Sequence, residues 1–133
     1  MKKIEHLGIA VKNMEASAML FEKLLGYAPY KTEEVPTEGV NTLFFKCGES
    51  KIELLEATNE QSPIAKFLEK KGEGIHHIAF EVGDLATEMN RLIKEGFALI
   101  NETPKLGADN KLVVFLHPKS TNGVLIELCQ DIK

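Results

Sequence analysis

The sequence predicts an α+β fold made of two tandem βαβββ modules, and the main observation behind this prediction is an internal repeat. The segment IEHLGIAV at residues 4–11 recurs as IHHIAFEV at residues 75–82. The segment KIELLEA at residues 51–57 recurs as LIELCQD at residues 125–131. Between these paired segments, each half of the chain has one helical pattern followed by short strand patterns. Each half is therefore expected to fold as strand, helix, strand, strand, strand.

A linker separates the two modules. Module one covers about residues 1–58 and module two about residues 74–133. The intervening SPIAKFLEKKGEG has Ser62 as a helix N-cap and Pro63 at the first helical position, which predicts a short helix over about residues 62–72. With 133 residues, the whole chain is expected to form a single domain.

Each module contains one helix with a clear start and stop. In module one, NMEASAMLFEKLLG places Asn13 at the N-cap and Gly26 after an apolar stripe with helical spacing. In module two, DLATEMNRLIKEG repeats the pattern with Asp84 and Gly96. KLGADNK at residues 105–111 is expected to be a turn. The strands after the helices are expected near residues 28–35, 41–47 and 51–57, and near residues 98–102, 112–117 and 124–129.

The composition argues against two kinds of partner. A net charge of −4, with charges of both signs scattered along the chain, does not suit a nucleic-acid surface, which needs a basic patch. The N-terminal apolar run is interrupted by Glu5, His6 and Lys12, and is too short and polar for a signal peptide or a membrane span. We therefore expect a cytoplasmic protein with no nucleic-acid or membrane partner, whose Cys47 and Cys129 are reduced.

Strand alternation distinguishes the two adjacent histidines of the second repeat. Successive side chains on a strand point to opposite faces, so His6 shares a face with Gly8. In the second copy His77 shares a face with Ala79, whereas His76 lies on the apolar face. His77 is thus the equivalent of His6. The small neighbours leave room beside both rings for something other than protein side chains.

Two glutamates also occupy equivalent places in the repeat, Glu53 and Glu127, each inside an apolar strand. A buried carboxylate is costly unless it is paired or coordinates a metal. Two imidazoles and two carboxylates suit a divalent cation such as cobalt, manganese, iron, nickel or zinc. The sequence therefore predicts a metal site made of His6, Glu53, His77 and Glu127. A purely structural pairing of these side chains is the alternative.

These segments resemble the vicinal oxygen chelate superfamily, which includes glyoxalase I, extradiol dioxygenases and bleomycin-resistance proteins. The resemblance covers nearly the whole chain and implies a glyoxalase-like fold, with a cup-shaped mixed sheet around a metal held by His6, Glu53, His77 and Glu127. Within the superfamily, three segments are similar to those of methylmalonyl-CoA epimerases. They are HLGIAVKNMEAS, the SPIAKFL linker followed by GIHHIAFEV, and FLHPKSTNGVLIEL.

The implied function is the metal-dependent interconversion of the 2R and 2S epimers of methylmalonyl-CoA by an isomerase. A divalent cation would act as a Lewis acid on the enolate that forms when the α proton is removed. Glu127 is the expected base, because related metalloenzymes use the last-strand glutamate in this way. Some epimerases carry a second glutamate after a GV pair, where this chain has Thr42. The second proton carrier is therefore water, another carboxylate, or Glu127 acting on a substrate that swings between faces.

The resemblance further implies cobalt as the metal, with manganese, nickel or zinc as alternatives, an acyl-CoA substrate and a homodimer. Two other functions are compatible with the fold. One is a glyoxalase I type lactoylglutathione lyase with the same four ligands, and the other is a metal-free binding protein of the antibiotic-resistance kind, which has no reason to keep both histidines and both glutamates. An extradiol dioxygenase is disfavoured, since its iron needs two histidines and a single carboxylate.

Overall fold

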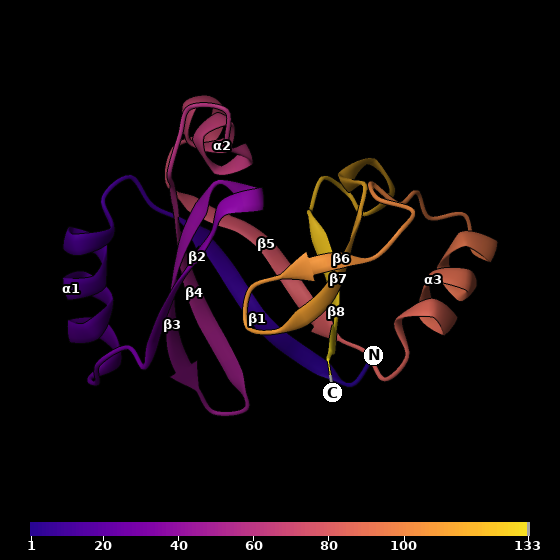
Figure 1. The fold of residues 1–133 in the computed structure, drawn as a ribbon, viewed down its shortest axis with the longest axis horizontal. Helices are drawn as coiled ribbons and strands as arrows, with labels where there is room; N and C mark the ends of the chain where they lie inside the picture. The colour runs from indigo at the N-terminus through magenta and orange to yellow at the C-terminus, as the bar shows by residue number, and fades with distance from the viewer. Residues whose placement is uncertain (133) are drawn as a thin grey trace. The chain divides into compact units, whose positions relative to one another are not determined.

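The computed structural model describes residues 1–132, and the chain in it forms two compact units. One unit is Leu7–His76, and the other combines Met1–His6 with the residues from His77 onward. The helices are α1 (Met14–Leu25), α2 (Pro63–Lys71) and α3 (Leu85–Lys94), with short 3-10 turns at Pro36–Glu38 and Pro118–Ser120. The strands are β1 (Lys3–Ala10), β2 (Lys31–Val35), β3 (Val40–Cys47), β4 (Ser50–Ala57), β5 (Gly74–Glu81), β6 (Lys105–Gly107), β7 (Lys111–Leu116) and β8 (Ile126–Asp131), as labelled in Figure 1.

The strand order confirms the predicted α+β class and the two βαβββ modules. Module one has the order β2-β3-β4-β1, and module two has the equivalent order β6-β7-β8-β5. In each module the first strand lies beside the last. The amide of Val11 donates to the carbonyl of Leu55 at 2.9 Å, and at the matching place Val82 donates to Cys129 at 2.9 Å. The two copies of the sequence repeat thus make equivalent hydrogen bonds between the first and last strands of their modules.

The predicted helix caps are confirmed. The Asn13 side chain accepts a hydrogen bond from the amide of Ala16 at 2.9 Å, and Asp84 accepts one from Thr87 at 3.2 Å. The two cap residues have nearly identical backbone angles, φ −134° and ψ 110° for Asn13, φ −136° and ψ 109° for Asp84. The Ser62 hydroxyl caps the linker helix α2 by accepting a hydrogen bond from the amide of Ile64. Each cap satisfies a backbone donor that has no partner within the helix.

Module two differs from the sequence prediction before β7. The strand predicted over residues 98–102 is wrong: this segment has only an isolated bridge between Leu99 and Leu116. Asn101 explains its early end, because the side-chain oxygen accepts from the amide of Phe115 at 2.9 Å and takes the place of a backbone partner. Pro104 has no amide hydrogen to donate to a ladder, and regular pairing with β7 resumes only at Lys105.

The turn predicted over residues 105–111 is shorter than expected. Lys105–Gly107 forms β6, which pairs antiparallel with β7, so pairing with a neighbour overrides a weak local pattern. The reversal itself uses Asp109 and Asn110, whose φ angles of 60° and 56° are tolerated by these residue types. The other predicted strands agree with the observed ones to within about three residues at each end, which is the usual variation in element boundaries.

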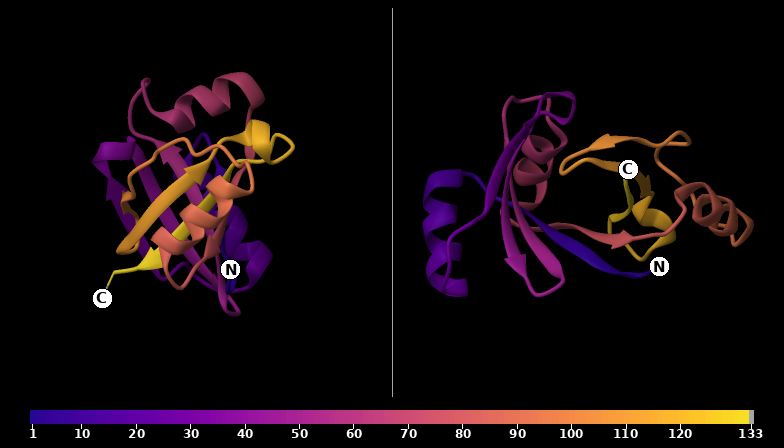
Figure 2. Two further views of the ribbon diagram at one scale, coloured as in Figure 1. Left: turned by 90° about the vertical axis from the view of Figure 1, so that its right-hand side faces the viewer. Right: turned by 60° about the horizontal axis from the view of Figure 1, so that its bottom comes forward.

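Each unit has its own apolar core. In the unit that contains β5, β7 and β8, helix α3 buries Leu85, Met89 and Leu92 against Val114 and Leu128. Figure 2 shows α3 lying along this group of strands. In the other unit α1 packs through partly buried side chains, including Phe21 and Leu25, against Phe45 and Leu54 of β3 and β4. Within residues 1–132, no helix is long and apolar enough to cross a membrane.

Candidate metal centre

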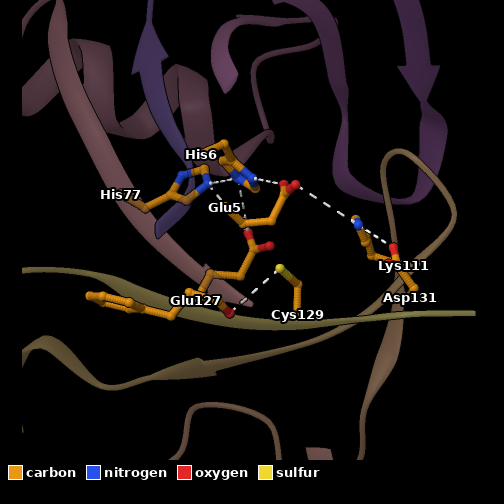
Figure 3. A network of polar contacts seen from close by, with 8 residues as sticks. Glu5, His6, His77, Lys111, Glu127, Cys129 and Asp131 are labelled. Carbon is orange, nitrogen blue, oxygen red and sulfur yellow. Dashed lines mark hydrogen bonds and ion pairs between the residues drawn. The ribbon is translucent and has the colours of Figure 1, made fainter. Parts of the chain in front are cut away.

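Two buried histidines face each other where β1 and β5 run side by side. The amide of Lys2 donates to the carbonyl of Glu81 at 2.8 Å, which holds the start of β1 beside the end of β5. Figure 3 shows the His6 and His77 side chains pointing toward each other from these strands. Their Nε2 atoms are 2.9 Å apart. Their rings are nearly perpendicular, at 87°. The repeat therefore brings the two equivalent histidines into direct contact.

Glu127 completes a cluster of three donor groups. It lies on β8, which runs parallel to β5 with Glu127 in register with Ala79. Its Oε1 atom is 3.3 Å from Nε2 of His77 and 3.8 Å from Nε2 of His6. All three side chains are buried, and one ligand atom from each lies within 4.8 Å of the others. This is a compact, buried set of two imidazole nitrogens and a carboxylate oxygen.

The charge state of Glu127 results from opposing effects. Burial and the nearby Glu5 raise the pKa of the Glu127 carboxyl, but the hydrogen bond from His77 and the electrostatic interactions with His6 and His77 lower it by more, so that the pKa lies below its ordinary value of 4.5. Glu127 is therefore ionised at neutral pH. Ionised carboxylate is the form that binds metals.

The contact between the two imidazoles is compatible with either a shared proton or a bound cation. Two Nε2 atoms 2.9 Å apart carry lone pairs that repel each other unless a proton or a cation lies between them. With an adjacent carboxylate, the three groups supply the nitrogen and oxygen donors that borderline divalent cations prefer. The donor set therefore fits a divalent metal ion.

Glu53 occupies the equivalent position in the other unit. It is buried on β4 and lies opposite Phe44 of β3, just as Glu127 lies opposite Phe115 of β7. Thr42 is buried on the same face of the β3–β4 pair, opposite Leu55. The role of Glu53 as a fourth ligand and that of Glu127 as the base stay predictions.

His76 has a different environment from His77. Its ring makes an edge-on contact with Phe67 of α2, with ring centroids 5.0 Å apart. This contact joins the linker helix to the start of β5. The strand alternation predicted that His76 and His77 point to opposite faces, and the two rings indeed have separate partners.

Two charged residues beside the cluster were missed in the sequence. Glu5 is only 2% exposed, and its Oε1 atom is 2.8 Å from Nδ1 of His6. Lys111 of β7 is also buried, with its Nζ atom 3.9 Å from Oε2 of Glu5. Glu5 lies inside an apolar strand, as Glu53 and Glu127 do, and the sequence could therefore have identified it as a buried carboxylate. Lys111 gave no such indication, because its burial depends on the pairing of distant strands.

Comparison with known proteins gives a consistent result. A family model described as the Glyoxalase/Bleomycin resistance protein/Dioxygenase superfamily matches residues 5–115. The chain is 42% identical over 130 residues to the ethylmalonyl-CoA/methylmalonyl-CoA epimerase of Cereibacter sphaeroides, covering 96% of this chain and 97% of that protein. It is 41% identical over 130 residues to the uncharacterized protein YqjC of Bacillus subtilis, covering 98% of this chain and 93% of that protein.

A solved structure with a bound acyl-CoA compound is also similar. A variant of the Streptomyces coelicolor methylmalonyl-CoA epimerase, in complex with 2-nitronate-propionyl-CoA, matches with a TM-score of 0.94 and 33% sequence identity. The match covers 98% of this chain and 95% of that one. Similarity to epimerases therefore extends over the full length of both modules.

Proposed function

This chain belongs to the glyoxalase/bleomycin resistance protein/dioxygenase superfamily and is related to methylmalonyl-CoA epimerases, and we propose that it interconverts the 2R and 2S epimers of methylmalonyl-CoA. The observation that carries this proposal is the buried convergence of His6, His77 and Glu127. The superfamily includes enzymes that catalyse different reactions on one fold. The full-length similarity to epimerases is the reason for choosing epimerisation among these reactions.

The proposed metal ligands are His6, His77 and Glu127, with Glu53 as the fourth. Glu53 is included because it is buried on β4 at the position that the repeat makes equivalent to Glu127. When bound, the divalent cation supplies Lewis-acid stabilisation of the negative charge that develops on the thioester oxygen as the α proton leaves. Cobalt is the metal we propose, with manganese, nickel and zinc as alternatives.

Glu127 is the proposed base. Its lowered pKa keeps the carboxylate ionised at neutral pH and able to accept a proton. We assign Oε1, the oxygen beside the two histidines, to the metal and Oε2 to the proton. Glu127 would remove the α proton of methylmalonyl-CoA, and the C–H electron pair would enter the enolate. A proton returned to the opposite face of the same carbon, by water, by another carboxylate or by Glu127 itself, gives the other epimer with no net change in composition.

The scaffold around these groups favours proton transfer in a dry environment. Ala79 is fully buried beside Glu127, and Phe115 makes an edge-on contact with His77 at 6.0 Å between ring centroids. Apolar walls of this kind exclude water and strengthen the electrostatic interactions within the site. The substrate class proposed from these features and from the relatives is a 2-substituted malonyl thioester of coenzyme A.

The test follows the α proton of methylmalonyl-CoA in deuterated water by proton NMR, with cobalt-loaded protein beside a chelator-treated sample. We expect metal-dependent loss of the α-proton signal together with conversion of one epimer into the other. Glu127→Gln, which keeps the shape of the side chain but cannot accept the proton as a carboxylate does, should abolish both. If cobalt binds while the α proton stays, the epimerase proposal is wrong, and glutathione hemithioacetals become the substrates to test.

The homodimer expected from the resemblance is proposed as the form in solution. Light scattering coupled to gel filtration measures it directly, because the chain mass of 14.8 kDa makes a dimer twice that value easy to distinguish. A mass that stays near the chain value at micromolar concentration contradicts the proposal.

A further inference from the structure

Glu5 is a buried carboxylate that the proposed reaction does not use. It precedes His6 on β1 and is more deeply buried than any of the proposed ligands. An ionised carboxylate in such a place is costly unless it has strong partners. Its partners include the Nδ1 atom of His6 at 2.8 Å and the Nζ atom of Lys111 at 3.9 Å. Both contacts are drawn as dashed lines in Figure 3.

The contact with Glu5 determines which nitrogen of His6 can bind a metal. A carboxylate only accepts hydrogen bonds, so Nδ1 of His6 must carry the proton. In a neutral ring the lone pair then lies on Nε2. Nε2 is the atom that faces His77 and Glu127, at 2.9 Å and 3.8 Å. The hydrogen bond from Nδ1 and the predicted ligand atom are therefore consistent.

Lys111 places a positive charge beside the buried Glu5 carboxylate. Its ammonium group lies 3.9 Å from Oε2, whereas the hydrogen bond with His6 is made by Oε1. Lys111 is in turn ion-paired with Asp131 of β8, whose side chain is 63% exposed. The charges thus alternate in sign from the protein surface to the histidine, an arrangement that lowers the cost of burying each one.

The second module lacks this arrangement at the equivalent position. The residue before His77 is His76, whose ring contacts Phe67. The βαβββ unit itself therefore does not need a carboxylate in this position. Glu5 is a feature of the first module alone, placed directly behind one proposed ligand.

We propose that Glu5 is a positioning residue for the metal site: it holds His6 in the Nδ1–H tautomer and fixes the direction of Nε2, while Lys111 places a positive charge beside the Glu5 carboxylate. This inference rests on the metal site of the proposed function. It does not depend on the substrate. Carboxylates that orient metal-binding histidines increase metal affinity by about 10–100-fold in other proteins.

The first test uses metal affinity and needs no substrate. Cobalt is titrated into the metal-free protein, with a competing chelator, for the wild type, Glu5→Gln and Asp131→Asn. We expect Glu5→Gln to weaken cobalt binding by about 10–100-fold. Asp131→Asn is the matched control, because it removes a charge at the exposed end of the same series, and its affinity should stay within about twofold of the wild type. Equal affinities for Glu5→Gln and the wild type overturn the proposal.

A second measurement requires no variant. Long-range proton–nitrogen NMR of the metal-free wild type at about pH 8 reports the tautomer of each histidine ring. The proposal requires His6 as the Nδ1–H form, and an Nε2–H form overturns it even if Glu5→Gln fails to fold. If the wild-type protein binds no cobalt, both this inference and the proposed metal site are wrong. If cobalt binds but the α proton of the substrate does not exchange, only the proposed reaction is wrong.

Discussion

The two modules use the same plan and differ at a few positions that matter for function. They share the histidine near the start of the first strand, the glutamate on the last strand opposite a phenylalanine, and the helix cap. They differ in the residue before the histidine, which is Glu5 in one module and His76 in the other. Glu5 bonds the ring of His6, and His76 contacts the linker helix. A duplicated unit can thus keep its donor groups while the neighbouring positions become specialised.

The helices of the two modules show a second difference. Helix α3 has three buried residues, whereas α1 has none and leaves Leu24 71% exposed. The ion pair between Glu88 and Arg91 on α3 has no counterpart on α1, where the repeat places Ser17 and Leu20 at these positions. The two helices therefore contribute differently to stability, although their caps are equivalent.

The largest expected effect tests whether His77, and not His76, is the second-module equivalent of His6. His77→Ala should remove metal binding and reduce activity by about 10³-fold or more, because a ligand is lost. His76→Ala should leave metal content unchanged and cost about 1 kcal/mol of stability through its contact with Phe67. Metal content of the purified variants is measured by elemental analysis. Loss of the metal from His76→Ala alone would show that the histidines are assigned in the wrong order.

The next effect separates the two helices. Met89 lies on the buried face of α3. Met89→Ala should lower the free energy of unfolding by about 2–4 kcal/mol because it leaves a cavity in the core. Leu24→Ala should change it by less than about 0.5 kcal/mol because the side chain is mostly exposed. Urea unfolding of the chelator-treated protein measures both. Similar losses for the two variants would mean that α1 is covered in solution, for example by a second copy of the chain.

Equal effects are expected at the two caps. Asn13→Ala and Asp84→Ala should each cost about 1 kcal/mol, since each removes one hydrogen bond to a helix amide in the same backbone geometry. The double variant should lose about the sum, because the caps belong to different units. A cost at one cap only, again from urea unfolding, would contradict the equivalence of the two helix starts.

The smallest effect concerns the ion pair that only α3 has. The hydrogen bond from Arg91 lowers the pKa of Glu88 below 4.5 despite slight desolvation, so the pair adds stability above about pH 4.5, and this is lost as pH falls through the lowered pKa. Glu88→Gln should therefore lower the Tm by about 1 °C at pH 7 in low salt, and the effect should shrink as the pH falls through the lowered pKa of Glu88. An unchanged Tm difference in 1 M salt would argue against a charge effect.

Local patterns in the sequence were sufficient for much of the fold. Asn13, Asp84 and Ser62 could be identified as caps because a cap needs only a short side-chain acceptor two or three residues before a free amide. The different environments of His76 and His77 followed from strand alternation. The segment over residues 98–102 was mispredicted because Asn101 bonds to the amide of Phe115, a partner that local propensity does not reveal.

The sequence by itself determined the repeat, the helix starts and the face of the strand on which each histidine lies, because these depend on neighbours a few residues apart. Only the tertiary structure decided that Nε2 of His6 meets His77 and Glu127, and that Lys111 lies beside Glu5. Those contacts join strands β1, β5, β7 and β8, and their geometry depends on how these strands are aligned with one another. Distances between side chains on different strands follow from that alignment, and composition and spacing along the chain do not contain it.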